Sequence, residues 1–213
     1  TVVAVDGGPG TVPDVNTSAS VTFTITVTAV NDAPVADAVS VTTDEDDSVT
    51  ITLSGSDIDG DSLSFAIGMG PTNGTLGAIS TIDATTAQVV YTPNGDFNGS
   101  DSFTYTVDDG TTGSGPATAS ISVDPANDAP AADAVTATTD EDNAVTITLS
   151  GSDIDADTLS FAIATGPTNG TLGAVTPIDA TTAEVTYTPN GDYNGSDSFT
   201  YTADDGAAGS APA

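Results

Sequence analysis

Apolar and polar residues alternate along this chain with a period of two. In residues 49–54, Val-Thr-Ile-Thr-Leu-Ser, every second side chain is apolar, and residues 63–67, 102–107 and 120–123 follow the same pattern. This period is typical of half-buried antiparallel strands, and Thr suits their outer face. No window has the period of an amphipathic helix, so we expect an all-β protein.

Turn residues divide the alternating segments into short strands. Asn73-Gly74, Asn94-Gly95 and Asp109-Gly110 are turn signals. Seven short strands in a domain-sized segment predict a Greek-key β-sandwich of the immunoglobulin-like type. We expect the aromatic side chains of Phe65, Tyr91, Phe103 and Tyr105 in its core. The strands are expected at about residues 36–43, 48–54, 63–68, 75–80, 86–92, 102–108 and 117–124.

The pattern then repeats without a gap. Residues 31–117 align with residues 127–213, so that Asn31-Asp32-Ala33-Pro34 returns as Asn127-Asp128-Ala129-Pro130. A period of domain size predicts separate sandwiches joined end to end rather than a solenoid. The expected divisions are the last strands of a preceding repeat at 1–30, a complete repeat at 31–126, and a repeat without its own last strand at 127–213.

The two ends of the chain suggest what completes the second repeat. Val21, Phe23, Ile25 and Val27 predict a last strand of the same kind as residues 117–124, and residues 1–8 resemble the strand before it. Two explanations remain open: residues 21–27 complete the second domain of a neighbouring subunit, or the chain is a window of a longer array. In both cases chain from outside the repeat should fill its open edge.

Composition excludes several function classes. The chain has 31 acidic residues, no Lys, Arg or His, and a formal charge of −31, so it has no basic patch for nucleic acid or an anionic membrane. It has no apolar run of membrane-spanning length. Without His, Cys or Lys, only a carboxylate pair could catalyse a reaction, as in glycoside hydrolysis. Because the acids recur in both repeats, we expect no enzyme.

The acids themselves predict a metal. Asp57, Asp59 and Asp61 stand two residues apart and return 96 residues later (153 − 57) as Asp153, Asp155 and Asp157. No cationic side chain offsets their repulsion, so a hard divalent cation, Ca²⁺ in the usual case, is the expected counterion. An EF-hand loop is excluded because its helices and twelfth-position Glu are missing. Four isolated acids are expected only to form turns: Asp37, Asp83, Asp133 and Asp179.

Successive strands run in opposite directions, so the connecting loops alternate between the two ends of a sandwich. Loops 44–47 and 94–101 should lie at one end, which we call the lower pole. Loops 57–61 and 108–109 should lie at the other end, the upper pole. Acidic loops of one repeat therefore face acidic loops of the next.

These motifs, in this order, resemble the cadherin-like tandem repeats of large calcium-dependent bacterial surface adhesins. The resemblance covers essentially the whole chain and depends on Asp-Glu-Asp-Asp at 44–47, Asp-Ile-Asp-Gly-Asp at 57–61, residues 91–106, Asp-Asp-Gly at 108–110 and Asn-Asp-Ala-Pro at 127–130. It implies Ca²⁺ between successive domains. At the 126/127 junction it implies the ligands Glu45, Asp96, Asn127, Asp128, Asp153, Asp155 and Asp205, with Asp157 completing the Asp-x-Asp-x-Asp loop.

The same resemblance implies two further groups of ligands, each belonging to one side of a domain junction. Near residue 31 the ligands would be Asn31, Asp32, Asp57, Asp59, Asp61 and Asp109, and Glu141 and Asp192 would face a following repeat. The sequence departs from the animal cadherin pattern in a shorter linker, and in Asn98, which stands where a Glu is expected. The number of ions per junction therefore stays open.

The resemblance implies a calcium-rigidified extracellular stalk or fibre module of a cell-surface adhesin, acting in adhesion or in matrix or biofilm assembly. Its partners would be neighbouring repeats or subunits of the same protein, with no nucleic acid and no membrane insertion in this segment. One alternative is a filament subunit joined by strand exchange. The other is a calcium-dependent module that binds glycan or ice, although such a tip should be unique in sequence and these repeats are near duplicates.

Overall fold

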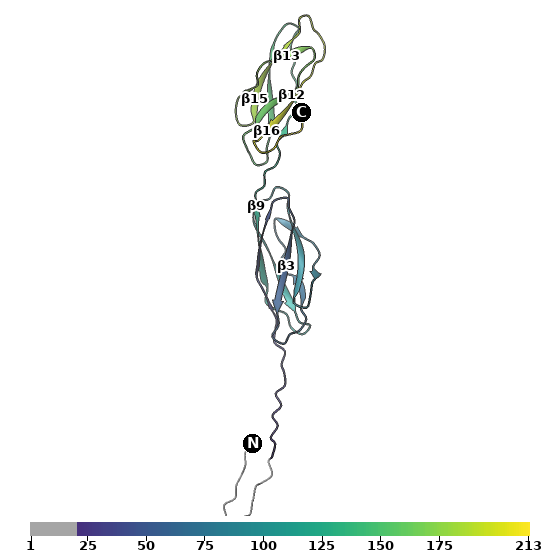
Figure 1. The fold of residues 1–213 in the computed structure, drawn as a ribbon, viewed down its shortest axis with the longest axis vertical. Helices are drawn as coiled ribbons and strands as arrows, with labels where there is room; N and C mark the ends of the chain where they lie inside the picture. Colours follow the sequence, from purple (N-terminus) through teal and green to yellow (C-terminus); the bar gives the residue numbers. More distant parts are fainter. Residues whose placement is uncertain (1–20) are drawn as a thin grey trace, which may run out of the picture.

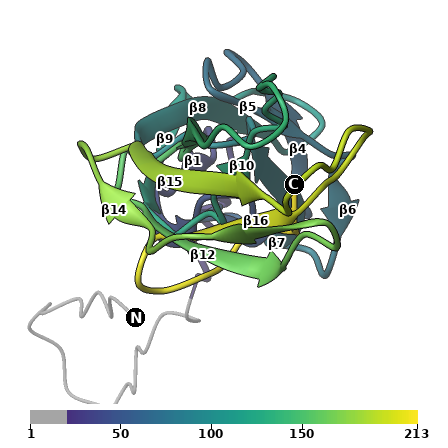
Figure 2. The same cartoon turned by 90° about the horizontal axis from the view of Figure 1, so that it is seen from above.

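Strand pairing organises residues 21–213, the part described by the computed structural model, into two β-sandwiches that follow one another along the long axis (Figure 1). Seen down that axis, the two domains overlap (Figure 2). No helix in these residues is long and apolar enough to cross a membrane. The tandem all-β sandwich fold expected from the period-two pattern is thus confirmed.

The first domain contains two facing sheets. One has the order β1-β3-β7-β5, with β6 also paired to β7, and the other has the order β2-β9-β8-β4. The strands are β1 (Val35–Ala36), β2 (Val39–Asp44), β3 (Val49–Ser56), β4 (Ser64–Ile67), β5 (Gly74–Leu76), β6 (Ser80–Thr81), β7 (Thr86–Pro93), β8 (Gly99–Asp108) and β9 (Ala117–Asp124).

Two expected strands are each divided in two. The strand expected at 36–43 becomes β1, which pairs antiparallel with β3, and β2, which pairs parallel with β9 in the opposite sheet. The break at residues 37–38 lets the chain cross between the sheets, where Asp37 N–H donates to the Ser54 carbonyl oxygen at 3.0 Å. The strand expected at 75–80 likewise becomes β5 and β6, both paired with β7.

The second domain repeats the first sheet but not the second. Its sheet β10-β11-β15-β13, with β14 on β15, matches the first domain, whereas β12 and β16 form a two-stranded sheet. The strands are β10 (Ala131–Ala132), β11 (Val145–Ser152), β12 (Ser160–Thr165), β13 (Gly170–Leu172), β14 (Thr176–Pro177), β15 (Thr182–Pro189) and β16 (Thr200–Asp204).

The inward side chains of the facing sheets form the core. In the first domain Tyr91, Phe103 and Tyr105 are fully buried, as expected, whereas Phe65 is half-buried and packs against this core. In the second domain the fully enclosed cluster is smaller and centres on Leu149, Val185 and Tyr201. The difference lies on the side of the sandwich where β9 closes the first domain.

The strand expected at residues 21–27 is not formed. Residues 21–34 precede β1 without a β-partner, and the side chains of Val21, Phe23, Ile25 and Val27 are 75–89% exposed. A strand requires a neighbour to satisfy its backbone groups, and no sheet lies beside this segment in the described structure (Figure 1). The expectation of a strand-like segment at residues 1–8 lies outside the described residues.

Candidate metal centre at the domain junction

The lower pole of the first domain brings two acidic loops together. Asp96, after β7, donates its N–H to Asp46 Oδ1, after β2, at 3.2 Å. Both residues have left-handed backbones, with φ of 58° and 63°. Such angles are uncommon outside glycine, and strained backbones of this kind gather at binding sites. The loop geometry thus directs both carboxylates toward the linker.

Asp128 in the linker completes this group. Carboxylate oxygens of Asp46, Asp96 and Asp128 all lie within 4.8 Å of one another. We call these three residues the junction cluster. It combines two loops of the first domain with the chain that enters the second domain, so any ion that it binds spans the boundary.

The upper pole of the second domain provides another acidic group beside it. Asp153 Oδ1 accepts the N–H of Asp155 at 2.9 Å and that of Asp157 at 3.3 Å. The three carboxylates, which we call the loop triad, also lie within 4.8 Å of one another. Asp128 N–H donates to Asp155 Oδ2 at 2.8 Å and so connects the loop triad to the junction cluster.

Within the described residues, both groups contain carboxylate oxygens without a partner. Asp128 Oδ2 and Asp153 Oδ2 are closed off from solvent and accept no hydrogen bond. Buried polar atoms nearly always have a hydrogen-bond partner. These two oxygens have none among the described residues, so each is free to bind a cation. Partial desolvation, reinforced by the charges of Asp46, Asp96, Asp155 and Glu45, holds the pKa of the Asp128 carboxyl above its ordinary value.

Glu45, a ligand implied by the resemblance, also holds the linker through hydrogen bonds. It is 3% exposed; its Oε1 accepts the Ala126 N–H at 2.8 Å and its Oε2 accepts Asn98 Nδ2 at 3.2 Å. Glu45 therefore fastens the start of the linker, while Asp46 stands in the three-acid group. Sequence analysis missed Asp46, although its equivalent in the second repeat, Asp142, was a usable signal.

Asn127 and Asp205 position the linker against the second domain. Asn127 Nδ2 donates to Asp205 Oδ2 at 2.9 Å and to the Asp128 carbonyl oxygen at 2.9 Å. The Ala208 N–H, the Asn127 amide and the Ala207 N–H hold the pKa of the Asp205 carboxyl below its ordinary value. Asp205 accepts all three of these hydrogen bonds and so holds the linker against the second domain.

The upper pole of the first domain has the same pattern of hydrogen bonds as that of the second. Asp57 Oδ1 accepts the N–H of Asp59 at 2.8 Å and of Asp61 at 3.3 Å, Asp32 N–H donates to Asp59 Oδ2 at 2.8 Å, and Asp57 Oδ2 is buried without a partner. Asn31 Nδ2 donates to Asp109 Oδ2 at 3.0 Å, as Asn127 does to Asp205.

The lower pole of the second domain is also partly prepared. Asp192 N–H donates to Asp142 Oδ1 at 3.0 Å, and both residues keep the left-handed backbone, with φ of 58° and 64°. Glu141, in contrast to Glu45, is exposed. The two loops of the second domain therefore hold Asp142 and Asp192 together by themselves. Glu45 is buried in the first domain because the last strand and the linker cover it, and Glu141 has no such cover among the described residues.

The acids expected to form turns have ordinary donors. Asp83 Oδ1 accepts the Thr85 N–H at 2.9 Å, Asp179 Oδ1 accepts the Thr181 N–H at 3.0 Å, and these bonds hold the pKa values of both carboxyls below the ordinary value. Asp37 and Asp133 each accept a Ser hydroxyl at 2.9 Å. Each of these four carboxylates is stabilised by hydrogen bonds and has no buried oxygen without a partner. In this they differ from Asp57, Asp128 and Asp153 at the poles.

The donor set at the junction fits a hard cation. The atoms that it offers to a metal are carboxylate oxygens, a ligand type that Ca²⁺ prefers. The chain contains no Lys, Arg or His that could neutralise them. Asp46, Asp96, Asp128 and the loop triad would hold such an ion or ions. The unpartnered oxygens are the structural observation that supports this fit.

Comparison with protein families decides the classification. The model of a bacterial Ig domain matches residues 31–122 and again residues 127–213. The chain belongs to the bacterial Ig domain family. Two tandem bacterial Ig domains thus account for nearly all of the described structure, and the search of curated proteins gave no match.

Several solved structures show a distant likeness to this chain. Human desmocollin-1 ectodomain is 16% identical, with 87% of this chain and 36% of that chain covered and a TM-score of 0.49. The Yersinia pseudotuberculosis adhesin InvE is 17% identical, with 84% and 57% covered and a TM-score of 0.34. The endo-fucoidan hydrolase MfFcnA4 of glycoside hydrolase family 107 is 22% identical, with 84% and 27% covered and a TM-score of 0.40.

All three TM-scores are below 0.5, so these likenesses carry no conclusion about this chain. This chain spans between 27% and 57% of the three structures' own length.

Proposed function

We propose that these tandem bacterial Ig domains form a calcium-stiffened, cadherin-like spacer in the stalk of an extracellular cell-surface adhesin. One observation carries the proposal: the first domain, the linker and the second domain each contribute carboxylates to one junction, through Asp46 and Asp96, Asp128, and Asp155. Some of their oxygens are buried without a donor. Ca²⁺ supplies the missing charge and ties both domains to the linker.

The same arrangement supports a structural rather than a catalytic role. The acids form equivalent groups at the poles of both repeats, and equivalent groups at successive joints suit a load-bearing spacer. We therefore propose no enzymatic activity, and we propose that its partners are neighbouring repeats of the same protein at the cell surface. A role in adhesion or in the assembly of a matrix or biofilm follows from that placement.

Calcium titration tests the proposal. Isothermal titration of the chain should show Ca²⁺ binding, with Mg²⁺ much weaker because Mg²⁺ demands a compact octahedral site. Asp128→Asn should weaken the junction sites by at least about tenfold, since losing even an outer-shell partner commonly costs that much metal affinity. The matched control is Asp32→Asn, the same position before the first domain, which should leave the junction sites unchanged.

Two results would overturn the proposal. The first is the absence of both heat and any change in thermal stability at millimolar Ca²⁺. The second is a loss of binding that is equal for Asp128→Asn and Asp32→Asn, because it would place the strong sites outside the junction.

A further inference from the structure

The acidic loops at the upper poles of the two domains differ at a backbone position that favours glycine. Residues 55–59 and 151–155 share the sequence Gly-Ser-Asp-Ile-Asp, but Gly60, the next residue of the first loop, is replaced by Ala156 in the second. Both residues have left-handed backbones, with φ of 80° and 62°. An L-residue is sterically destabilised in this conformation and Gly is not, so the second loop carries a strain that the first loop lacks.

Packing does not account for the difference between the two loops. A Cβ at Gly60 would meet nothing within 4 Å, and the side chain of Ala156 is exposed. The Ala156 N–H donates to the Asp153 carbonyl oxygen at 3.4 Å, which is long for such a bond. Ala156 therefore keeps its left-handed backbone only because the rest of its loop holds it there.

Two carboxylates hold the loop in this strained form. Asp153 Oδ1 accepts the N–H of Asp155 at 2.9 Å and of Asp157 at 3.3 Å, and Asp155 Oδ2 accepts the Asp128 N–H at 2.8 Å. Relaxation of Ala156 separates Asp155 and Asp157 from Asp153 and releases the linker as well. Repulsion within the loop triad, whose carboxylates lie within 4.8 Å of one another, acts in the same direction.

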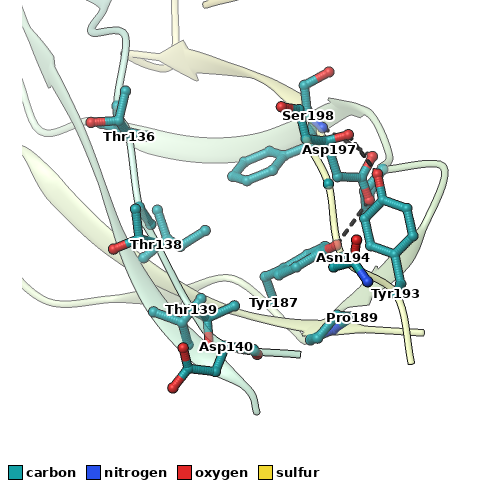
Figure 3. A pocket seen from close by; sticks show the side chains of 18 of the residues that line it. Thr136, Thr138, Thr139, Asp140, Tyr187, Pro189, Tyr193, Asn194, Asp197 and Ser198 are labelled. Carbon is teal, nitrogen blue, oxygen red and sulfur yellow. Dashed lines mark hydrogen bonds between the residues drawn. The ribbon is translucent and has the colours of Figure 1, made fainter. Parts of the chain in front are cut away.

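The hollow that distinguishes the second domain from the first does not reach this loop. It has a volume of about 550 Å³ and is lined mainly by residues 134–141 and 193–199. Figure 3 shows Tyr187 and Asp197 among the side chains around it. In the described structure none of its lining residues belongs to the loop at 153–157. The two upper loops can therefore be compared directly, with residues 60 and 156 as the difference.

We propose that Ala156 is a positioning residue of the junction: without a cation its strain opens the loop at 153–157, and Ca²⁺ closes the loop as it binds. The inference rests on the calcium site proposed above. A closing cation draws the loop triad together and restores the bond from the Asp128 N–H to Asp155. Because binding must also overcome the strain, the junction should need about fivefold more Ca²⁺ than it would with Gly at this position, the factor expected for one left-handed L-residue.

Amide hydrogen exchange, followed by NMR in EDTA, tests the strain without any metal. Asp59 and Asp155 both follow Asp-Ile and both donate to an Asp Oδ1, so in equally stable loops their amides exchange at equal rates. We expect Asp155 to exchange about fivefold faster than Asp59. Ala156→Gly should slow Asp155 by that factor. The matched variant, Gly60→Ala, should speed up Asp59 and leave Asp155 unchanged.

Isothermal titration with Ca²⁺ tests the consequence for the junction. Ala156→Gly should tighten the junction sites about fivefold, whereas Gly60→Ala should leave them unchanged. Saturating Ca²⁺ should slow the Asp155 amide of the wild type to its rate in Ala156→Gly. A residue that only stabilises the fold would shift the melting temperature without changing the calcium affinity, because its strain would be the same with and without the ion.

Two results would overturn the inference. One is an Asp155 amide that exchanges equally fast in the wild type and in Ala156→Gly. The other is a chain that binds Ca²⁺ with an affinity that Ala156→Gly leaves unchanged. If Ala156→Gly slows the exchange but neither chain binds Ca²⁺, the strained loop is supported and the proposed calcium site is overturned, so the two failures are distinguishable.

Discussion

Asp101 shows how a buried carboxylate stays charged in a chain without cationic side chains. It is 9% exposed and accepts four hydrogen bonds, from the N–H groups of Thr72, Asn73 and Ser102 and from the Tyr91 hydroxyl, at 2.8–3.0 Å. Burial raises the pKa of the Asp101 carboxyl, but these donors outweigh it and hold the pKa below its ordinary value. The hydrogen bonds stabilise the charged form and join β7 to β8.

Asp101→Asn should lower the free energy of unfolding of the first domain by about 2 kcal/mol, the typical value of hydrogen bonds to a charged group. Because the folded-state pKa is lowered, the contribution of Asp101 is complete above the unfolded-state pKa and is lost as pH falls through the folded-state pKa. Urea unfolding as a function of pH should therefore show a flatter acid limb for the variant.

Asp197, the equivalent residue in the second domain, is the matched control. It has the same donors but is only half-buried, so Asp197→Asn should cost less than Asp101→Asn. A larger cost at Asp197 would contradict the role given to burial.

Two positions in the first domain require glycine for different reasons, one for its backbone conformation and the other for its small size. Gly60 has φ of 80°, and a Cβ there would meet nothing within 4 Å; the second repeat places Ala156 at this position with φ of 62°. Gly74 has no such backbone, but a Cβ there would lie 2.4 Å from Tyr91 Cε2 and 2.7 Å from the Thr92 carbonyl oxygen. Conformation limits the first position and steric contact the second.

Gly60→Ala should therefore cost about 1 kcal/mol of stability, the penalty of a left-handed L-residue. Gly74→Ala should cost more, because Tyr91 is fully buried and backbone must shift. Thermal unfolding of the two variants gives the comparison. A larger loss for Gly60→Ala would show that the turn, not the packing against Tyr91, limits this domain.

At the level of elements, local sequence predicted where strands lie better than whether they pair. The period-two pattern located β3, β7, β8 and β9 within a few residues of their observed bounds. It could not show that 36–43 divides between two sheets, because the alternation continues through the break. It also did not point to Asp46 at the junction, because the approach of this loop residue to Asp96 and Asp128 depends on the folded loops.

The identical segments 99–103 and 195–199 give the physical reason for this limit. One forms a strand beside β9 and the other does not, so its state depends on a partner far away in sequence. Residues 21–27 were predicted as a strand for the same local reasons and form none. Pairing is a property of the neighbour as much as of the segment.

A partner supplied in the same chain should therefore complete the second domain. Adding Thr-Ala-Ser-Ile-Ser-Val-Asp after Ala213 repeats residues 118–124 in register with residues 135–140. We expect slower amide hydrogen exchange at 135–140 and 195–199 and a higher melting temperature of the second domain. The same extension with Asp at the Ala and Ile positions is the control, and equal protection in both chains would contradict the prediction.

At the scale of the whole molecule, the two sandwiches should be more robust than the joint between them. Each domain has its own buried core, whereas the junction holds carboxylates that repel one another without a cation. Removing Ca²⁺ with EDTA should broaden the distribution of end-to-end distances in small-angle scattering, while the β-sheet circular dichroism persists. Loss of both signals together would mean that calcium binding is part of the folding of each domain.

The parallel pairing of β2 and β9 also determines how the first domain bears tension. A pull on the two ends of the first domain is carried, once the short pairing of β1 with β3 has parted, by the start of β2 and the end of β9, so these two strands are drawn past each other. All the pairs from Val39 with Ala119 to Asp44 with Asp124 must then give way together, rather than one after another as in a zipper. The first domain is thus built to resist shear along this pair of strands.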